Sequence, residues 1–388
     1  MRDPFDIYEN RFIRDGLAKP GDILMGLADR ECRWNQDDTD IRRLESLFDR
    51  LDIKAVIYLR PAEPYRSIID YLAAASAGAI YPRDCETRML LKDLPVAEAL
   101  TPEHLTGVLE NRKSVIIRGG GIVATGRQDL KEAFVTTSSV CFACFVKFFS
   151  DLLKARKTGT MMPADRRIFE SVSHWIKPPA AAAGELMRGP FTAEELVLQA
   201  IYEAGKQVVD LRLVDSCFGN ISYHAGSMLY ISQSGTFLDE LAGGIACCPT
   251  DDITEAPGNA SSELPAHLEI FRKTGFRAIL HGHPRFSVIL SMDCDVPDCP
   301  YNGKCHQYCP YERYACDGIP IVSGEVGGGE YGLCHTVPEA VCGTPGVIVH
   351  GHGVFTCDET DFNGALLKLI DIERQCCIEY FRQMGLNR

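Results

Sequence analysis

Four of the ten histidines in this chain lie in two short apolar segments. His281 and His283 belong to AILHGHPRFSVIL, and His350 and His352 belong to GVIVHGHGVFT. Side chains at positions i and i+2 of a strand point to the same face, so His281 and His283 are expected to converge on one side of a sheet. Neutral imidazole binds zinc, iron, copper and nickel, which take three or four such ligands. A single His-x-His pair would more often be one buried and one exposed residue, but two such pairs favour a metal site.

The second segment offers two candidates for the third ligand. His350 and His352 share a face if both lie on a strand, so their spacing allows either one to bind metal. Gly351 and Gly353 flank His352 and leave its backbone conformationally free, which suits a side chain that must turn toward a shared site.

Composition limits the class of protein. The 388 residues are 46% hydrophobic and 24% charged, which is typical of a globular chain with two domains. The net charge of -13 argues against a nucleic acid or an anionic membrane as partner. The most apolar run, SSVCFACFVKFFSDLL, is expected to be broken by Lys147 and Asp151, so no segment is expected to span a membrane. The N-terminus has no apolar signal segment, so we expect a cytoplasmic protein whose 17 cysteines are reduced thiols or metal ligands.

An internal repeat suggests that the chain contains two diverged copies of one unit. Residues 54–72 (KAVIYLRPAEPYRSIIDYL) align with 277–292, and residues 114–134 (SVIIRGGGIVATGRQDLKEAF) align with 346–366. We therefore predict a first domain at 1–156, a Pro-, Ala- and Gly-rich linker at 157–190, and a second domain at 191–388. A capping box of Thr192 and Glu195 is expected to start the second domain's first helix, with an apolar stripe of Leu196, Val197, Ala200, Ile201 and Ala204.

The repeat also predicts that the first copy has no metal ligands. In the alignment, Tyr58 and Arg60 occupy the positions of His281 and His283, and Gly120 occupies that of His352.

Three motifs in order resemble the class II aldolase and adducin family, which includes L-fuculose-phosphate aldolase and L-ribulose-phosphate 4-epimerase. They are GNISYHAGSMLYISQSGTFLDEL, NASSELPAHLEIFRKTGFRAILHGHP and VIVHGHGVFT. The resemblance covers about residues 190 to 388 and, more weakly, 20 to 156. It implies an α/β fold with three α/β/α layers and a central, largely antiparallel sheet, present twice, with the N-terminal copy truncated.

The resemblance implies a zinc site, or a site for another divalent metal, at His281, His283 and His352, with Glu263 as the acid/base. Its His-Gly-Val pattern selects His352 as the third ligand. Such a metal would polarise a substrate carbonyl and stabilise an enediolate. From the residues alone, Glu263 would be interpreted as a solvated side chain at a helix start, where its charge meets the positive end of the helix dipole. His267, four residues later, is expected either to support the site or to pack in the core.

The family's phosphate pocket also has counterparts in this chain. Hydroxyl, amide and backbone N–H groups suit a phosphate or carboxylate. The matching residues are Asn220, Ser234, Gly235, Ser261 and Ser262.

The chain departs from the family pattern after IPIV. The aldolases have a tyrosine proton donor near this point, whereas this chain has Ser323, Gly324 and Glu325, with Tyr331 later.

A cysteine-rich stretch is the second departure. Its density suggests a second metal, as structural zinc or an iron–sulfur cluster, although reduced thiols in a loop remain the alternative. The insertion spans residues 294–316 and contains His306 and the cysteines Cys294, Cys299, Cys305, Cys309 and Cys316.

Taken with the resemblance, these motifs predict a metal-dependent lyase that cleaves or forms a carbon–carbon bond in a phosphorylated or carboxylated hydroxy-ketone. An epimerase, a keto-acid decarboxylase or a non-catalytic adducin-like scaffold are the alternatives. The family's rings, with active sites between subunits, further imply a homo-oligomer in which two chains build a four-unit ring.

Overall fold

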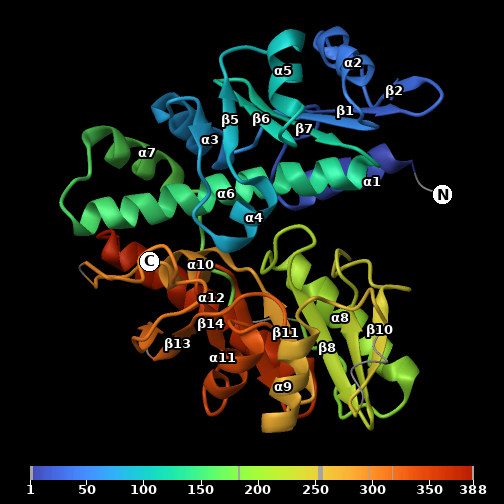
Figure 1. Cartoon of the computed structure of the whole chain (residues 1–388), viewed down its shortest axis with the longest axis vertical. Coiled ribbons are helices and arrows are strands. Elements are labelled where there is room, and N and C mark those ends of the chain that lie inside the picture. Colours follow the sequence, from blue (N-terminus) through green and yellow to red (C-terminus); the bar gives the residue numbers. More distant parts are fainter. Residues whose placement is uncertain (1–2, 182–183, 252–256, 297, 317, 387–388) are drawn as a thin grey trace. The chain divides into compact units, whose positions relative to one another are not determined.

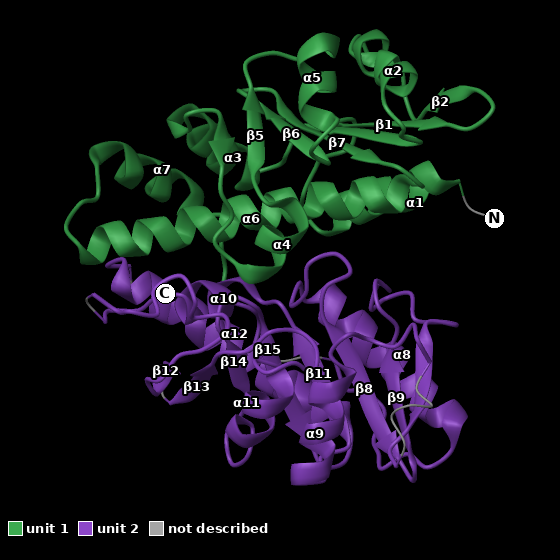
Figure 2. Cartoon of the chain, in the orientation of Figure 1, with its two compact units in different colours: residues 1–177 green, residues 178–388 purple. Residues whose placement is uncertain are grey.

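The computed structural model divides the chain into two compact units, residues 1–177 and 178–388, each considered separately (Figure 2). The boundary lies inside the segment 157–190 that was expected to be a linker, and helix α7 (Pro163–Ser173) also falls in that segment. α7 packs on α3 of unit 1. The residues described are 3–181, 184–251, 257–296, 298–316 and 318–386.

In its described part, residues 3–177, unit 1 has three layers around a seven-stranded sheet (Figure 1). The strand order is β2-β1-β3-β7-β6-β5-β4, and only the β5–β6 pair is parallel among the described strands. α6 lies on one face with α1, α3 and α4, and α2 and α5 cover the other face. The strands are β1 (Ile23–Ala28), β2 (Cys32–Trp34), β3 (Ala55–Leu59), β4 (Ala79–Ile80), β5 (Leu94–Ala97), β6 (Ser114–Ile117) and β7 (Gly121–Gly126); the helices are α1 (Pro4–Arg14), α2 (Ile41–Arg50), α3 (Tyr65–Ala75), α4 (Cys85–Leu91), α5 (Pro102–Leu109), α6 (Leu130–Lys157) and α7.

Unit 2 repeats this arrangement with one more strand. The order is β10-β9-β8-β11-β15-β14-β13-β12, and only β13–β14 is parallel among the described strands. α9 and α11 cover one face, and α8, α10 and α12 lie on the other. The strands are β8 (Asn220–Ala225), β9 (Met228–Ser232), β10 (Ile245–Pro249), β11 (Ala278–Gly282), β12 (Arg313–Ala315), β13 (Ile319–Val322), β14 (Val347–Val349) and β15 (Val354–Asp358); the helices are α8 (Glu194–Asp210), α9 (Leu264–Thr274), α10 (Arg285–Ser291), α11 (Leu333–Ala340) and α12 (Phe362–Gln383).

The two sheets correspond strand by strand, which supports the predicted internal repeat. β1, β2, β3, β4, β5, β6 and β7 match β8, β9, β11, β12, β13, β14 and β15 in order and in pairing direction. The pairing register places Tyr58 of β3 where β11 has His281, and Gly120 where His352 precedes β15. The expected three-layer α/β fold with a largely antiparallel sheet is therefore confirmed.

The positions in unit 1 that correspond to the histidines are satisfied by other contacts. The Tyr58 hydroxyl donates to the Gly120 carbonyl at 2.8 Å. The Arg60 guanidinium bridges Asp38 and Asp40, with N–O distances of 3.1 Å to each, and lies over the Tyr58 ring. Burial disfavours the phenolate and raises the pKa of Tyr58.

Helix α6 corrects the expectation for the most apolar run. Lys147 and Asp151 do not interrupt it: they lie one turn apart and form a 2.7 Å ion pair on a continuous helix. By length and composition alone α6 could cross a membrane, but 83% of its most apolar window is buried inside the protein. This burial is typical of the core helix of a globular unit.

The expected capping box at the start of α8 is wrong. The helix begins at Glu194, its N-cap residue is Ala193, and no side chain caps it. Thr192 is thus outside the capping position. Leu196 is 44% exposed, while the other four residues of the predicted apolar stripe are buried.

We expect Phe149→Ala to destabilise unit 1 by about 3–5 kcal/mol, because it removes a fully buried ring from the packing of α6. Phe149 contacts Phe145 and Phe148, with ring centroids 4.6 and 5.0 Å away. Urea unfolding followed by circular dichroism measures the change, with Lys154→Ala on the exposed side of α6 as the control. Equal stability of the two variants would contradict the assignment of α6 as a core helix.

Candidate metal centre

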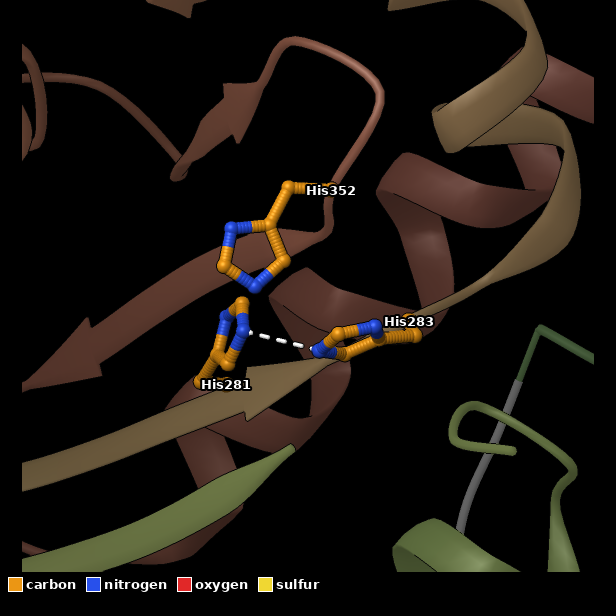
Figure 3. A group of neighbouring side chains, drawn as sticks. All are labelled: His281, His283 and His352. Atoms are coloured by element: carbon orange, nitrogen blue, oxygen red, sulfur yellow. Dashed lines mark hydrogen bonds between the residues drawn. The ribbon is translucent and has the colours of Figure 1, made fainter. Parts of the chain in front are cut away.

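Three histidines from two segments of unit 2 converge on one buried point (Figure 3). His281 lies in the central strand β11, His283 follows the end of that strand, and His352 lies in the turn between β14 and β15. One ring nitrogen from each histidine lies within 4.8 Å of the others, and the residues are only 1%, 3% and 5% exposed. The structure thus brings together the three predicted ligands.

Glycine allows the two segments to approach this closely. A Cβ atom on Gly353 would lie 2.4 Å from the Gly282 carbonyl oxygen and 2.7 Å from Cε1 of His281. Gly351 has a φ of +61°, which glycine adopts without strain. The turn is closed by a 3.1 Å hydrogen bond from the His352 N–H to the Val349 carbonyl.

Neighbouring groups orient the His281 and His283 rings. Nδ1 of His281 lies 3.1 Å from the Val354 carbonyl, which can only accept, so Nδ1 carries the proton and Nε2 has a free lone pair. Nε2 of His283 lies 3.0 Å from Nε2 of His281. This distance is close to the roughly 3.3 Å that separates two nitrogen ligands of a tetrahedral zinc ion. The His281 ring stacks on Phe355 and the His283 ring on Phe218.

The protonation states of these histidines suit a metal. Burial lowers the pKa of His281 to about 4, although the nearby Glu263 carboxylate acts in the opposite direction. Burial also lowers the pKa of His283 well below its ordinary value. Both imidazoles are therefore neutral at pH 7, which metal binding requires.

Glu263 faces the histidines from the N-cap position of α9. Its two carboxylate oxygens lie 3.4 Å from Nε2 of His281 and 3.2 Å from Nε2 of His352. Burial favours the neutral form of this carboxyl, but His281, His352 and the Asn220 amide outweigh burial and lower the Glu263 pKa below its usual range. At 5% exposure, Glu263 is a buried carboxylate and not a solvated side chain at a helix start.

A chain of buried hydrogen bonds supports Glu263. The Asn220 amide donates to Glu263 at 2.6 Å, so its carbonyl oxygen faces His267 and accepts from Nε2 of that ring. Nδ1 of His267 then accepts from the Ser222 hydroxyl at 2.7 Å. Burial lowers the pKa of His267 to about 3, so the ring is neutral. His267 was expected either to support the site or to pack in the core. Its hydrogen bonds to Asn220 and Ser222 agree with the first of these expectations.

The residues matched to the phosphate pocket lie in two adjoining loops beside Glu263, apart from Asn220 on β8. The Ser234 N–H donates to the Asn259 carbonyl at 3.0 Å, which aligns the loop after β9 with the loop before α9. Ser261 is buried, and its hydroxyl accepts from the Glu263 N–H at 3.3 Å. The remaining three residues are exposed: Ser234, Gly235 and Ser262.

His350 lies outside the cluster of three histidines. Nδ1 of its ring is 2.9 Å from both the Ser291 carbonyl oxygen and a guanidinium nitrogen of Arg313. The backbone N–H of His350 donates to the Val322 carbonyl. Burial lowers its pKa to about 4. Geometry therefore places His352 at the cluster and His350 beside the cysteine-rich insertion.

The segment that replaces the expected tyrosine contacts that insertion. The Ser323 hydroxyl donates to the Cys305 carbonyl at 2.6 Å, and the Gly324 N–H donates to the His306 carbonyl at 3.0 Å. Glu325 accepts from the Gln307 amide at 2.9 Å. Tyr331 is 40% exposed.

Two positioning residues are not evident from the sequence patterns. Glu373 on α12 is buried and accepts hydrogen bonds from the N–H groups of Phe286 and Ser287 at 2.9 Å, which caps α10 just after His283. Gly219 has a φ of +80°, and a Cβ there would lie 2.6 Å from the His281 carbonyl oxygen. The sequence does contain one sign of the role of Glu373, because this acidic residue lies within the apolar stripe of the last helix.

One family of known proteins matches the part of the chain that contains this site. The family model of the class II aldolase and adducin N-terminal domain matches residues 199–380. The structure is similar to L-fuculose-1-phosphate aldolase from Thermus thermophilus, at 22% identity and TM-score 0.40, over 50% of this chain and 96% of that one. It is also similar to YgbL, a putative aldolase/epimerase/decarboxylase from Escherichia coli, at 17% identity and TM-score 0.38, over 47% and 87% of the two chains.

We expect Gly353→Ala to lower metal affinity roughly ten- to a hundredfold, the size of effect typical of a lost supporting contact. The added methyl group would force the turn away from β11 and separate His352 from His281. Competition with a chelator, read by elemental analysis, measures the change. Gly329→Ala is the control, because a Cβ at Gly329 meets no atom within 4 Å. Unchanged affinity in Gly353→Ala would show that the close approach is not required.

We expect Asn220→Leu to destabilise unit 2 by roughly 2–6 kcal/mol, because Glu263 and His267 each lose a buried partner at about 1–3 kcal/mol apiece. Chemical unfolding measures the difference, and the exposed Ser262→Ala is the control. A loss no larger than that of the control would mean that the hydrogen-bond chain does not hold the site.

Proposed function

We propose, on the premise that residues 199–380 belong to the class II aldolase and adducin family, that unit 2 is a metal-dependent lyase. Its substrate would be a phosphorylated or carboxylated hydroxy-ketone, in which it breaks or forms a carbon–carbon bond. The observation that carries this proposal is the position of the Glu263 carboxylate, 3.2 to 3.4 Å from two of three clustered imidazoles in a buried site.

The three histidines fit a divalent cation such as zinc. They are buried and convergent, His281 and His283 are neutral, and three protein ligands leave a coordination position open for substrate. A bound zinc ion supplies Lewis-acid polarisation of a substrate carbonyl oxygen. The chain's own contribution is to hold the rings, because Phe355, Phe218 and the Val354 carbonyl fix the orientation of two of them.

Glu263 is the residue placed to move a proton. It is ionised, so it can take a proton from a substrate hydroxyl or carbon beside the histidines and return it later. The Asn220 amide keeps one carboxylate oxygen directed toward His281. Since Tyr331 is exposed and Ser323 and Glu325 bind the insertion, Glu263 is our candidate for both proton-transfer steps.

The exposed loop residues beside Glu263 are the proposed site for the substrate's anionic group. Ser262 offers a hydroxyl, whereas the Ser234 hydroxyl donates to the Ala260 carbonyl at 3.1 Å and would have to turn to reach a ligand. Gly235 has a φ of +72°, and a Cβ added there would meet no atom within 4 Å, so its backbone is open to a ligand. Hydroxyl and N–H donors can bind a phosphate or carboxylate without a lysine.

A purely structural role fits these observations less well. A scaffold does not require three buried imidazoles around an ionised carboxylate, which are costly to bury. The equivalent positions of unit 1 show another solution, in which Tyr58 and Arg60 form their own hydrogen bonds and ion pairs.

We expect a variant with His281, His283 and His352 all changed to alanine to lose one equivalent of divalent metal and all lyase activity. Elemental analysis and a panel of sugar phosphates and hydroxy-keto acids, assayed for the carbonyl product, provide the two measurements. His104→Ala, at an exposed position on α5, is the matched control. A total metal content in the triple variant equal to that of the unmodified chain would contradict the proposal.

We expect Glu263→Gln to keep the metal but to lower the rate about 10²- to 10⁴-fold, the usual contribution of a general acid/base. Full activity in this variant would assign proton transfer to another group.

A further inference from the structure

The cysteine-rich insertion follows α10, which ends at Ser291, and its first four cysteines precede β12, which begins at Arg313. Its described residues before β12 form neither a helix nor a strand. A connection of this length without secondary structure is uncommon in a compact unit and is usually either functional or a linker. All 17 cysteines are present as thiols, so no disulfide stabilises this segment.

Successive turns fold the insertion back on itself. The Asn302 N–H donates to the Cys299 carbonyl at 3.1 Å, and the Lys304 and Tyr308 N–H groups donate to the Tyr301 and Lys304 carbonyls at 2.8 and 3.1 Å. The aromatic rings of Tyr301 and Tyr308 pack at 5.4 Å between centroids. These contacts fold the segment from Cys299 to Cys309 into a compact series of turns.

The pKa of Cys305 is affected by the other three cysteines of the segment. Burial raises its pKa, and the nearby thiols of Cys309, Cys294 and Cys299 raise it further by electrostatic repulsion, while Arg313 acts in the opposite direction. The start of the group lies near its end, because Asp293, which precedes Cys294, accepts a hydrogen bond from Arg313, four residues after Cys309. Cys316 has a different neighbour, because its sulfur lies 3.7 Å from that of Cys376 on α12.

The insertion is anchored to the fold on both sides of the cysteine group. Arg313 donates to the carbonyls of Ser291 and Asp293 at 2.6 and 2.8 Å, which joins the two ends of the loop. The hydrogen bond from Ser323 holds Cys305 itself. The loop is therefore held at its base and at Cys305.

We propose that Cys294, Cys299, Cys305 and Cys309 form a second metal centre with four thiolate ligands, which takes structural zinc or an iron–sulfur cluster. Both are bound by four cysteines, and soft thiolates select them over magnesium or calcium. Among the described residues, only the three histidines form a group of three or more possible ligands whose ligand atoms all lie within 4.8 Å of one another. The four cysteine sulfurs would therefore have to move closer together when the metal binds, and their thiols would release protons.

This centre would fix the insertion and, through Ser323, the segment that follows β13. Its role is structural and does not depend on the lyase proposal.

The test uses the full chain carrying the three histidine-to-alanine changes, purified without oxygen, so that remaining metal belongs to the cysteines. We expect one equivalent of zinc without acid-labile sulfide, or iron with matching sulfide; these two results distinguish the two centres. Changing Cys294, Cys299, Cys305 and Cys309 to serine should remove it, whereas the control changes Cys316→Ser and Cys342→Ser should not.

If the four-serine variant folds poorly, a cobalt titration and a single cysteine change test the same proposal. Cobalt(II) titration of the otherwise unmodified chain should give a thiolate-to-cobalt charge-transfer band, and the single change Cys309→Ser should weaken that band. Absence of the band together with no zinc, iron or sulfide after reconstitution would overturn the proposal. Metal retained by a folded four-serine variant would also overturn it.

Discussion

The site depends on the close approach of the turn before β15 to the end of β11. At Gly353 there is no room for a side chain, because a Cβ would lie 2.4 Å from the Gly282 carbonyl oxygen. This contact brings His352 over a strand end that already presents His281 and His283 from one face, and it places all three rings below the surface. Burial then keeps the imidazoles of His281 and His283 neutral, so packing and protonation state have the same physical origin.

Unit 1 shows that this close approach belongs to the fold and not to the metal. Gly121 corresponds to Gly353, and a Cβ there would lie 2.2 Å from the Leu59 carbonyl oxygen. In that unit the same geometry carries a tyrosine–carbonyl hydrogen bond and an arginine held between two aspartates. The shared backbone provides a convergent point, and the side chains at three positions decide whether it offers metal ligands. The histidines of unit 2 and the tyrosine and arginine of unit 1 thus lie on or beside sheets whose corresponding strands have the same order.

The sequence predicted the parts of the site that local patterns encode. Alternation on a strand placed His281 and His283 on one face, and the glycines around His352 indicated an unusual turn. Choosing His352 over His350, and assigning a role to Glu263, required the family resemblance because both depend on contacts between distant segments. The chain from Ser222 through His267 to Asn220 was not predicted, since its members are 45 and 47 residues apart in the contacts that join them. The capping box predicted for Thr192 and Glu195 was also wrong, because the helix begins one residue later than that pattern requires, at Glu194.

The most direct test of the central claim is anomalous X-ray diffraction from crystals of the full chain grown with zinc, recorded on both sides of the zinc absorption edge. We predict an anomalous peak between His281, His283 and His352, about 2.0–2.1 Å from one ring nitrogen of each, with Glu263 facing it. A zinc-loaded crystal with no peak at this point would contradict the assignment of the three histidines as the metal site.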